Sequence, residues 1–394
     1  MNIFKNNTNV YPKTEYGKYF TTEQAKKTVD YHRSFEEYSV TPLVELKGLA
    51  KNLDLDGFYI KDESYRFGLN AFKVLGGSFA IGNYIAKRLG MDISELTSDK
   101  LTSKTVKDEL GDITFITATD GNHGRGVAWT ANRLGQKSIV YMPKGTASER
   151  LENIRKLGSQ AYILDLDYDD CVRLAGKKAN EEGMVLIQDT VYGENTHIPL
   201  YVMQGYMTMV HEAIEQLNGV RPTHIFLQAG VGSMAATVTA YVSNFYGDYK
   251  PIIVIVEPHS ANCLYLTAKA EDGELHACEG EMNSMMAGLC CGEVCPMAWD
   301  ILRKNAEYFI TISDDSAAKG MRALYLATDG DRRVISGESG ASTTGAVIDI
   351  MTNPECEEIK KELSLNESSV VLCFSTEGDT DKENFQEIVK GRLG

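Results

Sequence analysis

The stretch TATDGNHGRG, residues 117–126, follows the apolar run around Phe115 and precedes the helical pattern VAWTANRLG. A strand that ends in a glycine-containing turn and continues into a helix is the βα unit of α/β proteins. The backbone N–H groups at such a turn and the positive end of the helix favour an anion. Asp120 is therefore unexpected here, because its carboxylate would be repelled unless it faced a cation or were protonated.

Outside this stretch, short β-rich runs alternate with amphipathic helical patterns at spacings that are typical of βα units. We expect strands at 58–62, 113–117, 138–142, 161–165, 184–188, 224–228, 251–257 and 369–374. Helical patterns occupy 149–158, 172–183 and 202–217. The sequence therefore predicts an α/β fold with mostly parallel sheets.

Composition limits the classes of protein to consider. The chain has 394 residues, of which 43% are hydrophobic and 24% charged, which is enough for a large core and favours two domains. The 40 basic and 55 acidic residues give a net charge of −15 without a basic stripe, so we expect no nucleic-acid partner. No apolar leader begins the sequence and no run approaches the roughly 18 apolar residues of a membrane span. We therefore expect a cytoplasmic protein without a membrane partner.

The eight cysteines contain no C-x-x-C pair, and no two histidines have the spacing of metal ligands. This pattern argues against a zinc site, and we expect no metal. Buried thiols are the simplest interpretation of these cysteines. The alternative is a redox-sensitive pair, formed by Cys263 with one of the clustered Cys290, Cys291 and Cys295.

Several segments carry residues suited to chemistry. In GLNAFKVLGG (68–77), Lys73 opens a helix whose other side is small and apolar, although a lysine at such a position is usually only solvated. In LQAGVGSMAA (227–236), Gly230 and Gly232 separate a strand from a helix, which suits a phosphate but also a plain tight turn. SGESGA (336–341) and STEGDT (375–380) follow later in the chain.

This order of segments resembles the fold type II family of pyridoxal phosphate enzymes. The motifs KDESYRFGLNAFKVLGG, ATDGNHGRGVAW, YMPKGTASER, LQAGVGSMA, MAGLCCGE, ISGESGA and STEGDTD, which extend from Lys61 to Asp381, resemble the diaminopropionate ammonia-lyases within it. The resemblance implies two domains, each with a mostly parallel twisted sheet flanked by helices. Residues 1–112 and 191–394 would form a large cofactor-binding domain and 113–190 a small domain.

The resemblance also implies roles for single residues. Lys73 would hold pyridoxal 5'-phosphate as a Schiff base, and Asn122 would hydrogen-bond the phenolic oxygen of the cofactor. Either Ser375 or Thr376 would place a hydroxyl against the pyridine nitrogen. Glu338 matches a family glutamate near the same edge, or it is a capping carboxylate. The phosphate would bind Gly230, Val231, Gly232, Ser233 and Met234.

The implied reaction is the α,β-elimination of 2,3-diaminopropionate to pyruvate and two molecules of ammonia. A substrate with a second ammonium group supplies the cation that Asp120 needs. Lys73 and Asp120 would act as bases on opposite faces, so both D and L substrates would react. Asp189, at the end of an expected strand, offers another carboxylate at the edge where ligands bind, or it is an ordinary turn residue.

Two other functions are compatible with the same sequence. A serine or threonine dehydratase of the same fold would prefer hydroxy amino acids to the diamine. A nucleotide-binding or pyridoxal-carrier protein would bind its ligand without turnover. The family resemblance implies a homodimer with a small amino acid as substrate.

Overall fold

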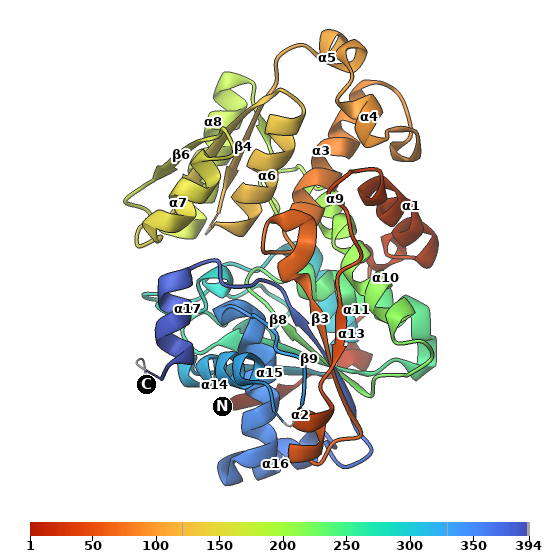
Figure 1. The fold of residues 1–394 in the computed structure, drawn as a ribbon, viewed down its shortest axis with the longest axis vertical. Helices are drawn as coiled ribbons and strands as arrows, with labels where there is room; N and C mark the ends of the chain where they lie inside the picture. The colour runs from red at the N-terminus through yellow and green to blue at the C-terminus, as the bar shows by residue number, and fades with distance from the viewer. Residues whose placement is uncertain (120, 329, 392–394) are drawn as a thin grey trace.

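The computed structural model describes residues 1–119, 121–328 and 330–391, in which the strands form two sheets (Figure 1). The larger sheet has the strand order β1-β10-β9-β8-β11-β3-β2, and all its pairings are parallel except those of the two edge strands, β1 and β2. Its strands are β1 Asn2–Lys5, β2 Leu43–Glu45, β3 Gly57–Asp62, β8 His224–Gln228, β9 Ile252–Pro258, β10 Tyr308–Ile312 and β11 Val370–Ser375.

The smaller sheet has the order β6-β5-β4-β7 and is entirely parallel. Its strands are β4 Thr114–Ala118, β5 Lys137–Met142, β6 Gln160–Ile163 and β7 Val185–Leu186. The expected α/β class with mostly parallel sheets is therefore confirmed. The strands of this sheet all lie within 113–190 and those of the larger sheet outside it, but the exact domain limits stay a prediction.

Helices cover both sheets, and in Figure 1 α6, α7 and α8 surround the smaller one. Helix α3 packs against both α6 and α9 and so connects the two parts of the molecule. The α-helices are α1 Thr22–Arg33, α2 Lys47–Asn52, α3 Val74–Arg88, α4 Ser98–Leu101, α5 Lys104–Leu110, α6 Asn122–Arg133, α7 Ser148–Arg155, α8 Tyr168–Glu182, α9 His197–Gly205, α10 Met207–Gln216, α11 Ser233–Tyr246, α12 Cys263–Ala270, α13 Pro296–Asn305, α14 Asp314–Leu326, α15 Glu338–Thr352, α16 Glu357–Glu362 and α17 Lys382–Val389.

The fold differs from the expected elements in two respects. Strands β1, β2 and β10 were not expected from the sequence, and two of them are short edge strands. The single helix expected over 202–217 is divided, because α9 ends at Gly205 and α10 begins at Met207. Gly205 contacts the backbone of α3 so closely that a Cβ atom on it would lie 2.3 Å from the Leu75 carbonyl oxygen. The chain therefore breaks between α9 and α10 at the point where Gly205 packs closely against α3.

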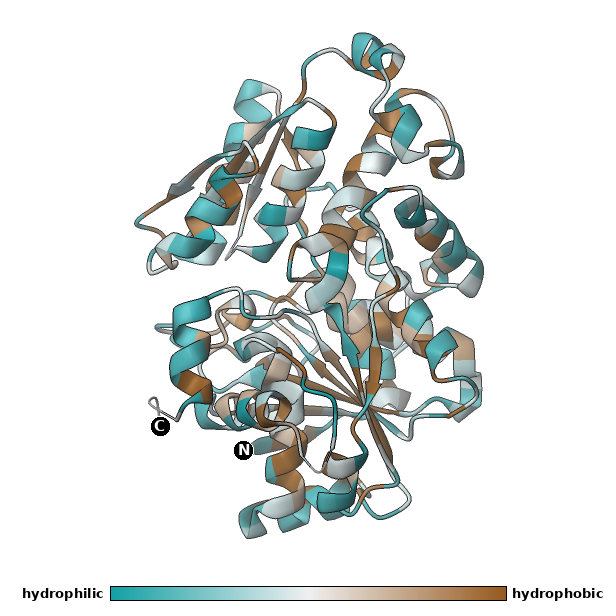
Figure 2. Ribbon diagram, viewed as in Figure 1, coloured by the Kyte–Doolittle hydropathy of each residue, from teal (hydrophilic) through white to brown (hydrophobic). Residues whose placement is uncertain are grey.

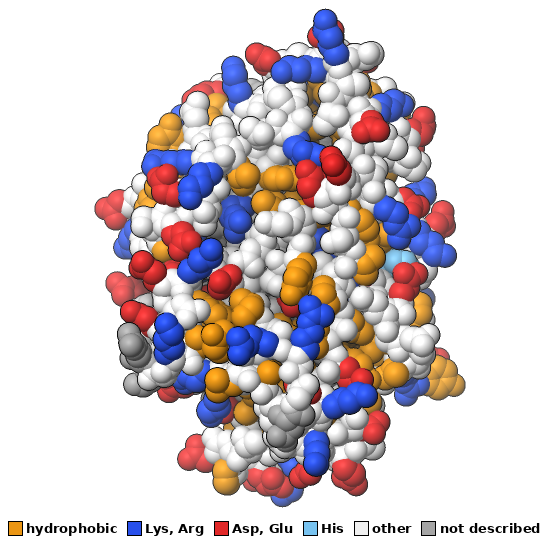
Figure 3. All heavy atoms as spheres, in the orientation of Figure 1, with side chains coloured by type: hydrophobic (Ala, Val, Ile, Leu, Met, Phe, Trp, Pro, Cys, Tyr) orange, Lys and Arg blue, Asp and Glu red, His pale blue; other side chains and the backbone are white. Residues whose placement is uncertain are grey.

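The core follows the central strands of the larger sheet. Every residue of β8 and β11 is buried, and Figure 2 shows hydrophobic residues concentrated along these strands. Such near-continuous apolar runs are typical of parallel strands that are covered on both faces. On the face shown in Figure 3, acidic and basic side chains are interspersed. No helix in the described ranges is long and apolar enough to cross a membrane.

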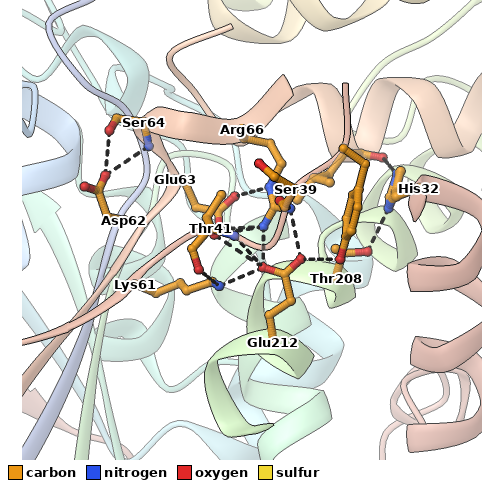
Figure 4. A network of polar contacts seen from close by, with 12 residues as sticks. His32, Ser39, Thr41, Lys61, Asp62, Glu63, Ser64, Arg66, Thr208 and Glu212 are labelled. Carbon is orange, nitrogen blue, oxygen red and sulfur yellow. Dashed lines mark hydrogen bonds and ion pairs between the residues drawn. The ribbon is translucent and has the colours of Figure 1, made fainter. Parts of the chain in front are cut away.

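A buried network of charged side chains fixes the segment between β3 and α3 (Figure 4). Lys61 on β3 and Arg66, in the 3₁₀ segment Glu63–Gly68, both contact Glu212 on α10 at 2.7 Å. Arg66 Nε also donates to Glu63 at 2.8 Å. Two cations thus face two carboxylates, and a buried charge is tolerated only with such partners. The network therefore holds the backbone that leads to Lys73.

Candidate active site

A cavity of about 590 Å³, open to solvent, lies at the carboxyl ends of β8 and β11. This edge of an open parallel sheet is where α/β proteins usually bind ligands. The cavity contains a cation, two carboxylates, several hydroxyl or amide groups and a glycine-rich turn. The lining residues are Phe72, Lys73, Asn122, Asp189, Tyr206, Gln228, Ala229, Gly230, Val231, Gly232, Ser233, Met234, Gly288, Leu289, Cys291, Ser339, Thr376 and Glu377.

Lys73 is the residue directly before α3, and the backbone on its amino-terminal side is fixed by the turn after β11. Phe72 N donates to the Thr376 carbonyl oxygen at 3.0 Å, and Gly378 N donates to the Asn70 carbonyl oxygen at 3.0 Å. Helix α6 packs tightly on the other side, since a Cβ atom on Gly126 would lie 2.6 Å from the Val74 Cα atom. Two separate parts of the chain therefore position the amine.

The amine of Lys73 donates to Asp189 Oδ2 at 2.8 Å. Burial acts to raise the pKa of Asp189, but the Lys73 ammonium, His123 and a hydrogen bond from Tyr168 together hold it well below its usual range. Tyr168 donates to the other carboxylate oxygen at 3.1 Å, and Ser233 Oγ donates to the Asp189 backbone carbonyl at 2.6 Å. Asp189 is therefore an ionised carboxylate in the cavity, directly beside the amine.

The turn between β8 and α11 brings the five expected phosphate-binding residues, Gly230 to Met234, to the wall of the cavity. The first N–H groups of a helix have no partner within it and carry its positive end, so this turn suits an anion. Gly232 has a φ of +100°, which favours glycine, and a Cβ atom on Gly230 would lie 2.9 Å from Cys291 Sγ. A side chain on Gly230 would therefore displace Cys291, and Gly232 holds a backbone conformation that other residues rarely adopt.

The structure differentiates between the two hydroxyl residues at the end of β11. Thr376 lines the cavity and accepts a hydrogen bond from Gln228 Nε2 at 3.0 Å. Ser375 does not line it, and its hydroxyl donates to Ser336 Oγ at 2.8 Å. Successive residues of a strand point to opposite sides, so only one of them can face the ligand. Thr376 has that orientation.

Asn122, the first residue of α6, reaches across to the end of the larger sheet. Its Nδ2 atom donates to Glu377 Oε2 at 2.5 Å, and Ser339 N donates to Glu377 Oε1 at 3.2 Å. Because the carboxylate can only accept, this contact fixes which end of the Asn122 amide faces Glu377. Within the described residues the second Nδ2 hydrogen has no acceptor, so it is available to a ligand oxygen in the cavity.

Glu338 is not part of this cavity. It is the first residue of α15 and lines an adjacent larger cavity, where Asn384 Nδ2 donates to its Oε1 atom at 2.5 Å. Burial and the nearby Glu377 carboxylate raise the pKa of Glu338 to about 7, against the lowering effect of Arg150. Glu338 therefore does not line the cavity that contains Asp189 and the glycine-rich turn, but it shares the adjacent cavity with Lys73. Asp120 lies outside the described residues.

The lining residues that were not expected from the sequence include four with hydroxyl, amide or carboxylate side chains: Tyr206, Gln228, Glu377 and Ser339. Gln228 and Glu377 stand within or beside the motifs LQAGVGSMA and STEGDTD, so their positions offered a signal. Ser339 lies within the motif ISGESGA and had the same kind of signal, whereas Tyr206 lies outside the quoted motifs. None of the eight cysteines forms a disulfide. The redox-sensitive pair of Cys263 with the 290–295 cluster is thus not formed in this structure.

These residues fit pyridoxal phosphate. The cavity offers an amine for a covalent link, a helix amino terminus for the phosphate, an amide donor and a hydroxyl. Gln228 Oε1 and Ser339 Oγ are buried at its wall with no hydrogen-bond partner in the described part of the chain. Buried polar atoms usually have partners, so these two indicate a polar ligand or water.

Comparison with known proteins assigns the class. A family model described as "Pyridoxal-phosphate dependent enzyme" matches residues 35–375. The chain therefore belongs to the pyridoxal-phosphate-dependent enzymes, and its cofactor is pyridoxal phosphate. Within this class it belongs to the diaminopropionate ammonia-lyase family: it is 48% identical to the diaminopropionate ammonia-lyase of Salmonella typhimurium over 363 residues, which are 91% of this chain and 90% of that protein.

Solved structures agree with this assignment. The crystal structure of the Escherichia coli diaminopropionate ammonia-lyase in complex with D-serine matches with a TM-score of 0.92 and 41% identity, over 99% of this chain and 97% of that one. A threonine deaminase from Solanum lycopersicum matches with a TM-score of 0.72 at 19% identity, over 99% of this chain and 96% of that one. The second match shows a shared fold alone.

Proposed function

We propose that this protein catalyses the α,β-elimination of 2,3-diaminopropionate to pyruvate and two molecules of ammonia, and that it accepts both the D and L enantiomers. The contact between Lys73 and Asp189 is the observation that carries the proposal. It places an ionised, buried carboxylate next to the amine that the substrate must displace. A diamine brings its own ammonium group to replace that partner, whereas a hydroxy amino acid would leave Asp189 without a cation.

The residues around the cavity have separate roles in the proposed reaction. When bound, pyridoxal phosphate withdraws electrons and makes the substrate Cα proton acidic. The turn at Gly230–Met234 would hold the phosphate, and the Asn122 amide would donate its second N–H to the phenolic oxygen. Lys73 would form the covalent link to the cofactor, and its free amine would take the Cα proton from one face of the substrate. This proton transfer starts the elimination.

Asp189 acts on the leaving group. Its low pKa keeps it ionised at neutral pH, so it has no proton to give. It can instead bind the substrate β-ammonium and keep that group protonated, which is the form in which nitrogen departs as ammonia. Loss of this contact should therefore matter for an amine leaving group and little for one that needs no proton.

The acceptance of D substrates rests on Asp120. A base on the face opposite Lys73 is needed to remove the Cα proton of the other enantiomer, and we assign that role to Asp120. The homologous Escherichia coli enzyme has been crystallised with D-serine, which supports access of D amino acids to a site of this kind. We further propose that the protein is a cytoplasmic homodimer and that 113–190 forms its small domain.

A substrate screen tests this proposal. Ammonia and pyruvate are measured with D- and L-diaminopropionate, serine and threonine, with a Lys73→Ala protein as the control. We expect both diaminopropionates to react fastest and to yield two ammonia per pyruvate. A serine or threonine dehydratase would instead prefer the hydroxy amino acids, and its ratio from serine is one to one. Faster turnover of serine or threonine would therefore contradict the proposal, and a carrier protein would turn over none of the four.

A further inference from the structure

We propose that Gln228 is a positioning residue that commits the Thr376 hydroxyl to donate a hydrogen bond to the pyridine nitrogen, and so keeps that nitrogen unprotonated. The proposal rests on the cofactor and the elimination described above. It adds a residue that acts through another one to set the reaction specificity. The inference starts from the contacts of a single buried amide.

The orientation of the Gln228 amide is fixed by a backbone carbonyl. Gln228 is the last residue of β8, and its Nε2 atom lies 2.8 Å from the Phe374 carbonyl oxygen. A carbonyl oxygen can only accept, so the Nε2 end of the amide must face it. Turning the amide over would place Oε1 against that carbonyl, with repulsion in place of a hydrogen bond.

The same Nε2 atom uses its second hydrogen on Thr376. The distance from Gln228 Nε2 to Thr376 Oγ1 is 3.0 Å, and both side chains are buried. Because an amide nitrogen only donates, Thr376 Oγ1 is the acceptor in this contact. The Phe374 carbonyl therefore fixes the orientation of the Gln228 amide, and the amide in turn makes Thr376 Oγ1 an acceptor.

A threonine hydroxyl has one hydrogen to donate and two lone pairs that accept. Gln228 occupies one lone pair, and in the described part of the chain the structure gives the hydroxyl hydrogen no acceptor. Thr376 lines the cavity, so this hydrogen is available to a ligand there. The lone pair of an unprotonated pyridine nitrogen would accept this hydrogen. If the nitrogen were protonated, its N–H hydrogen and the Thr376 hydroxyl hydrogen would point at each other and repel.

The protonation of this nitrogen changes the chemistry. A protonated ring withdraws electrons more strongly and prolongs the life of the carbanion, which favours side reactions such as transamination. An unprotonated ring is a weaker electron sink and suits an enzyme that expels a β-substituent at once. Gln228 would thus favour elimination over competing reactions without touching the substrate.

The test uses the nearly isosteric Gln228→Glu variant. A carboxylate at this position accepts from Thr376, so the hydroxyl must turn its lone pair toward the ring, and the nitrogen should become protonated. We would load the holoenzyme with pyridoxal phosphate labelled with ¹⁵N in the ring and record the ¹⁵N chemical shift. The wild-type shift should be that of an unprotonated pyridine, and the variant shift should move toward that of a pyridinium.

Two further proteins keep the test decisive. Ser336→Ala removes the partner of Ser375 but leaves Thr376 intact, so its ¹⁵N shift should equal that of the wild type. In a Thr376→Val background, adding Gln228→Glu should produce no further change, because the effect passes through the hydroxyl. We also expect the ratio of transamination to elimination to rise up to about tenfold in Gln228→Glu, which corresponds to about one hydrogen bond.

The outcomes separate this proposal from the proposed function. An unchanged ¹⁵N shift in a folded, cofactor-loaded Gln228→Glu protein would overturn it, whatever the substrate. Equal effects of Gln228→Glu with and without the Thr376 hydroxyl would also overturn it, because Gln228 would then act on the ring directly. If Gln228→Glu fails to retain cofactor, Gln228→Met replaces it: without the amide donor the hydroxyl is no longer committed, and a shift identical to wild type would be contrary to the proposal.

Discussion

At the scale of single residues, the site depends on how the carboxylates near Lys73 are partnered. Asp189 has an ammonium and a phenol as partners and stays ionised, whereas Glu338 is buried beside another carboxylate and its pKa rises to about 7. Burial is common to both, so the difference comes from the charge of the neighbour. The same argument makes Asp189, and not Glu338, suitable for holding a cationic substrate.

The role of Asp189 predicts a difference between substrates. Asp189→Asn keeps the shape but removes the charge that holds the β-ammonium. We expect kcat/KM for diaminopropionate to fall at least about tenfold more than kcat/KM for β-chloroalanine, whose chloride leaves without a proton. Steady-state kinetics with both substrates measure this. Equal losses would assign Asp189 to holding Lys73 alone.

Asp120 predicts a difference between enantiomers. If it is the base for the D substrate, Asp120→Asn should lower kcat for D-diaminopropionate by about 10² to 10⁴, the range for loss of a general base. The L substrate, deprotonated by Lys73, should lose less in kcat. Its KM should rise by about tenfold if the carboxylate also binds the ammonium. Proportional kcat losses for D and L would show that Asp120 only positions the substrate.

At the scale of elements, the site is made by turns that join strands to helices. The β8–α11 turn is the proposed phosphate site, the start of α6 supplies Asn122, and the segment before α3 supplies Lys73. The segment that carries Lys73 is fixed at two places: the start of α3 by backbone hydrogen bonds to the turn after β11, and the chain leading to it by the network of Figure 4. Substitutions that disrupt these hydrogen bonds or this network should therefore move Lys73 and weaken cofactor binding.

Substitution of Gly232 tests the phosphate turn. Gly232→Val forces a β-branched residue into a φ of +100° and places a Cβ atom 3.2 Å from Ala298 and Leu264 side chains. We expect cofactor affinity to fall by about tenfold or more, as strain of a few kcal/mol displaces the turn. Gly247→Val, at the other end of α11 with a φ of +56° and open space around it, is the control. Equal cofactor retention after dialysis of both variants would contradict the assignment.

The buried charge network predicts a large stability effect. Arg66→Ala leaves Glu63 and Glu212 without their common cation, and breaking a buried ion pair from one side costs about 3–5 kcal/mol. Urea unfolding should show this loss. Arg33→Ala breaks an exposed pair with Asp30 at 3.5 Å and should cost less than about 1 kcal/mol. A similar small loss for Arg66→Ala would mean that the network is dispensable.

The sequence predicts elements more reliably than side-chain directions. Each of the eight expected strands overlaps an observed one, because apolar runs between turns are a strong signal. The edge strands β1 and β2 are short and partly exposed, so they lack that signal. The choice between Ser375 and Thr376 depends on the register at the end of β11. Adjacent residues alternate in direction, and a sequence does not give the phase of that alternation.

At the scale of the whole molecule, Glu338 lies in a cavity that is lined by residues from both parts of the chain. The larger cavity beside the active site is lined by Arg150 on α7, near the smaller sheet, and by Glu338 and Asn384 on α15 and α17, near the larger one. Titration of Glu338 therefore changes the charge between the two parts. Because the pKa of Glu338 is raised in the folded protein, the free energy of unfolding should depend on pH.

Whether stability rises or falls with pH depends on which state, folded or unfolded, binds more protons. A glutamate in the unfolded chain titrates near pH 4.3, about its reference value, whereas in the folded protein the pKa of Glu338 is about 7. Between these values the folded state binds more protons than the unfolded state, so stability falls as pH rises through this window. The loss is complete above about pH 8, and it amounts to at most about 3.7 kcal/mol.

Glu338→Gln should remove this loss. The neutral amide can still accept from Asn384, so we expect the variant to be more stable than wild type at pH 8 by up to about 3.7 kcal/mol, with the difference falling to about 1 kcal/mol near pH 5. Urea unfolding at several pH values measures it, and Glu355→Gln, at an exposed residue, is the control. A difference that does not vary between pH 5 and 8 would show that Glu338 carries the same charge in the folded and unfolded states.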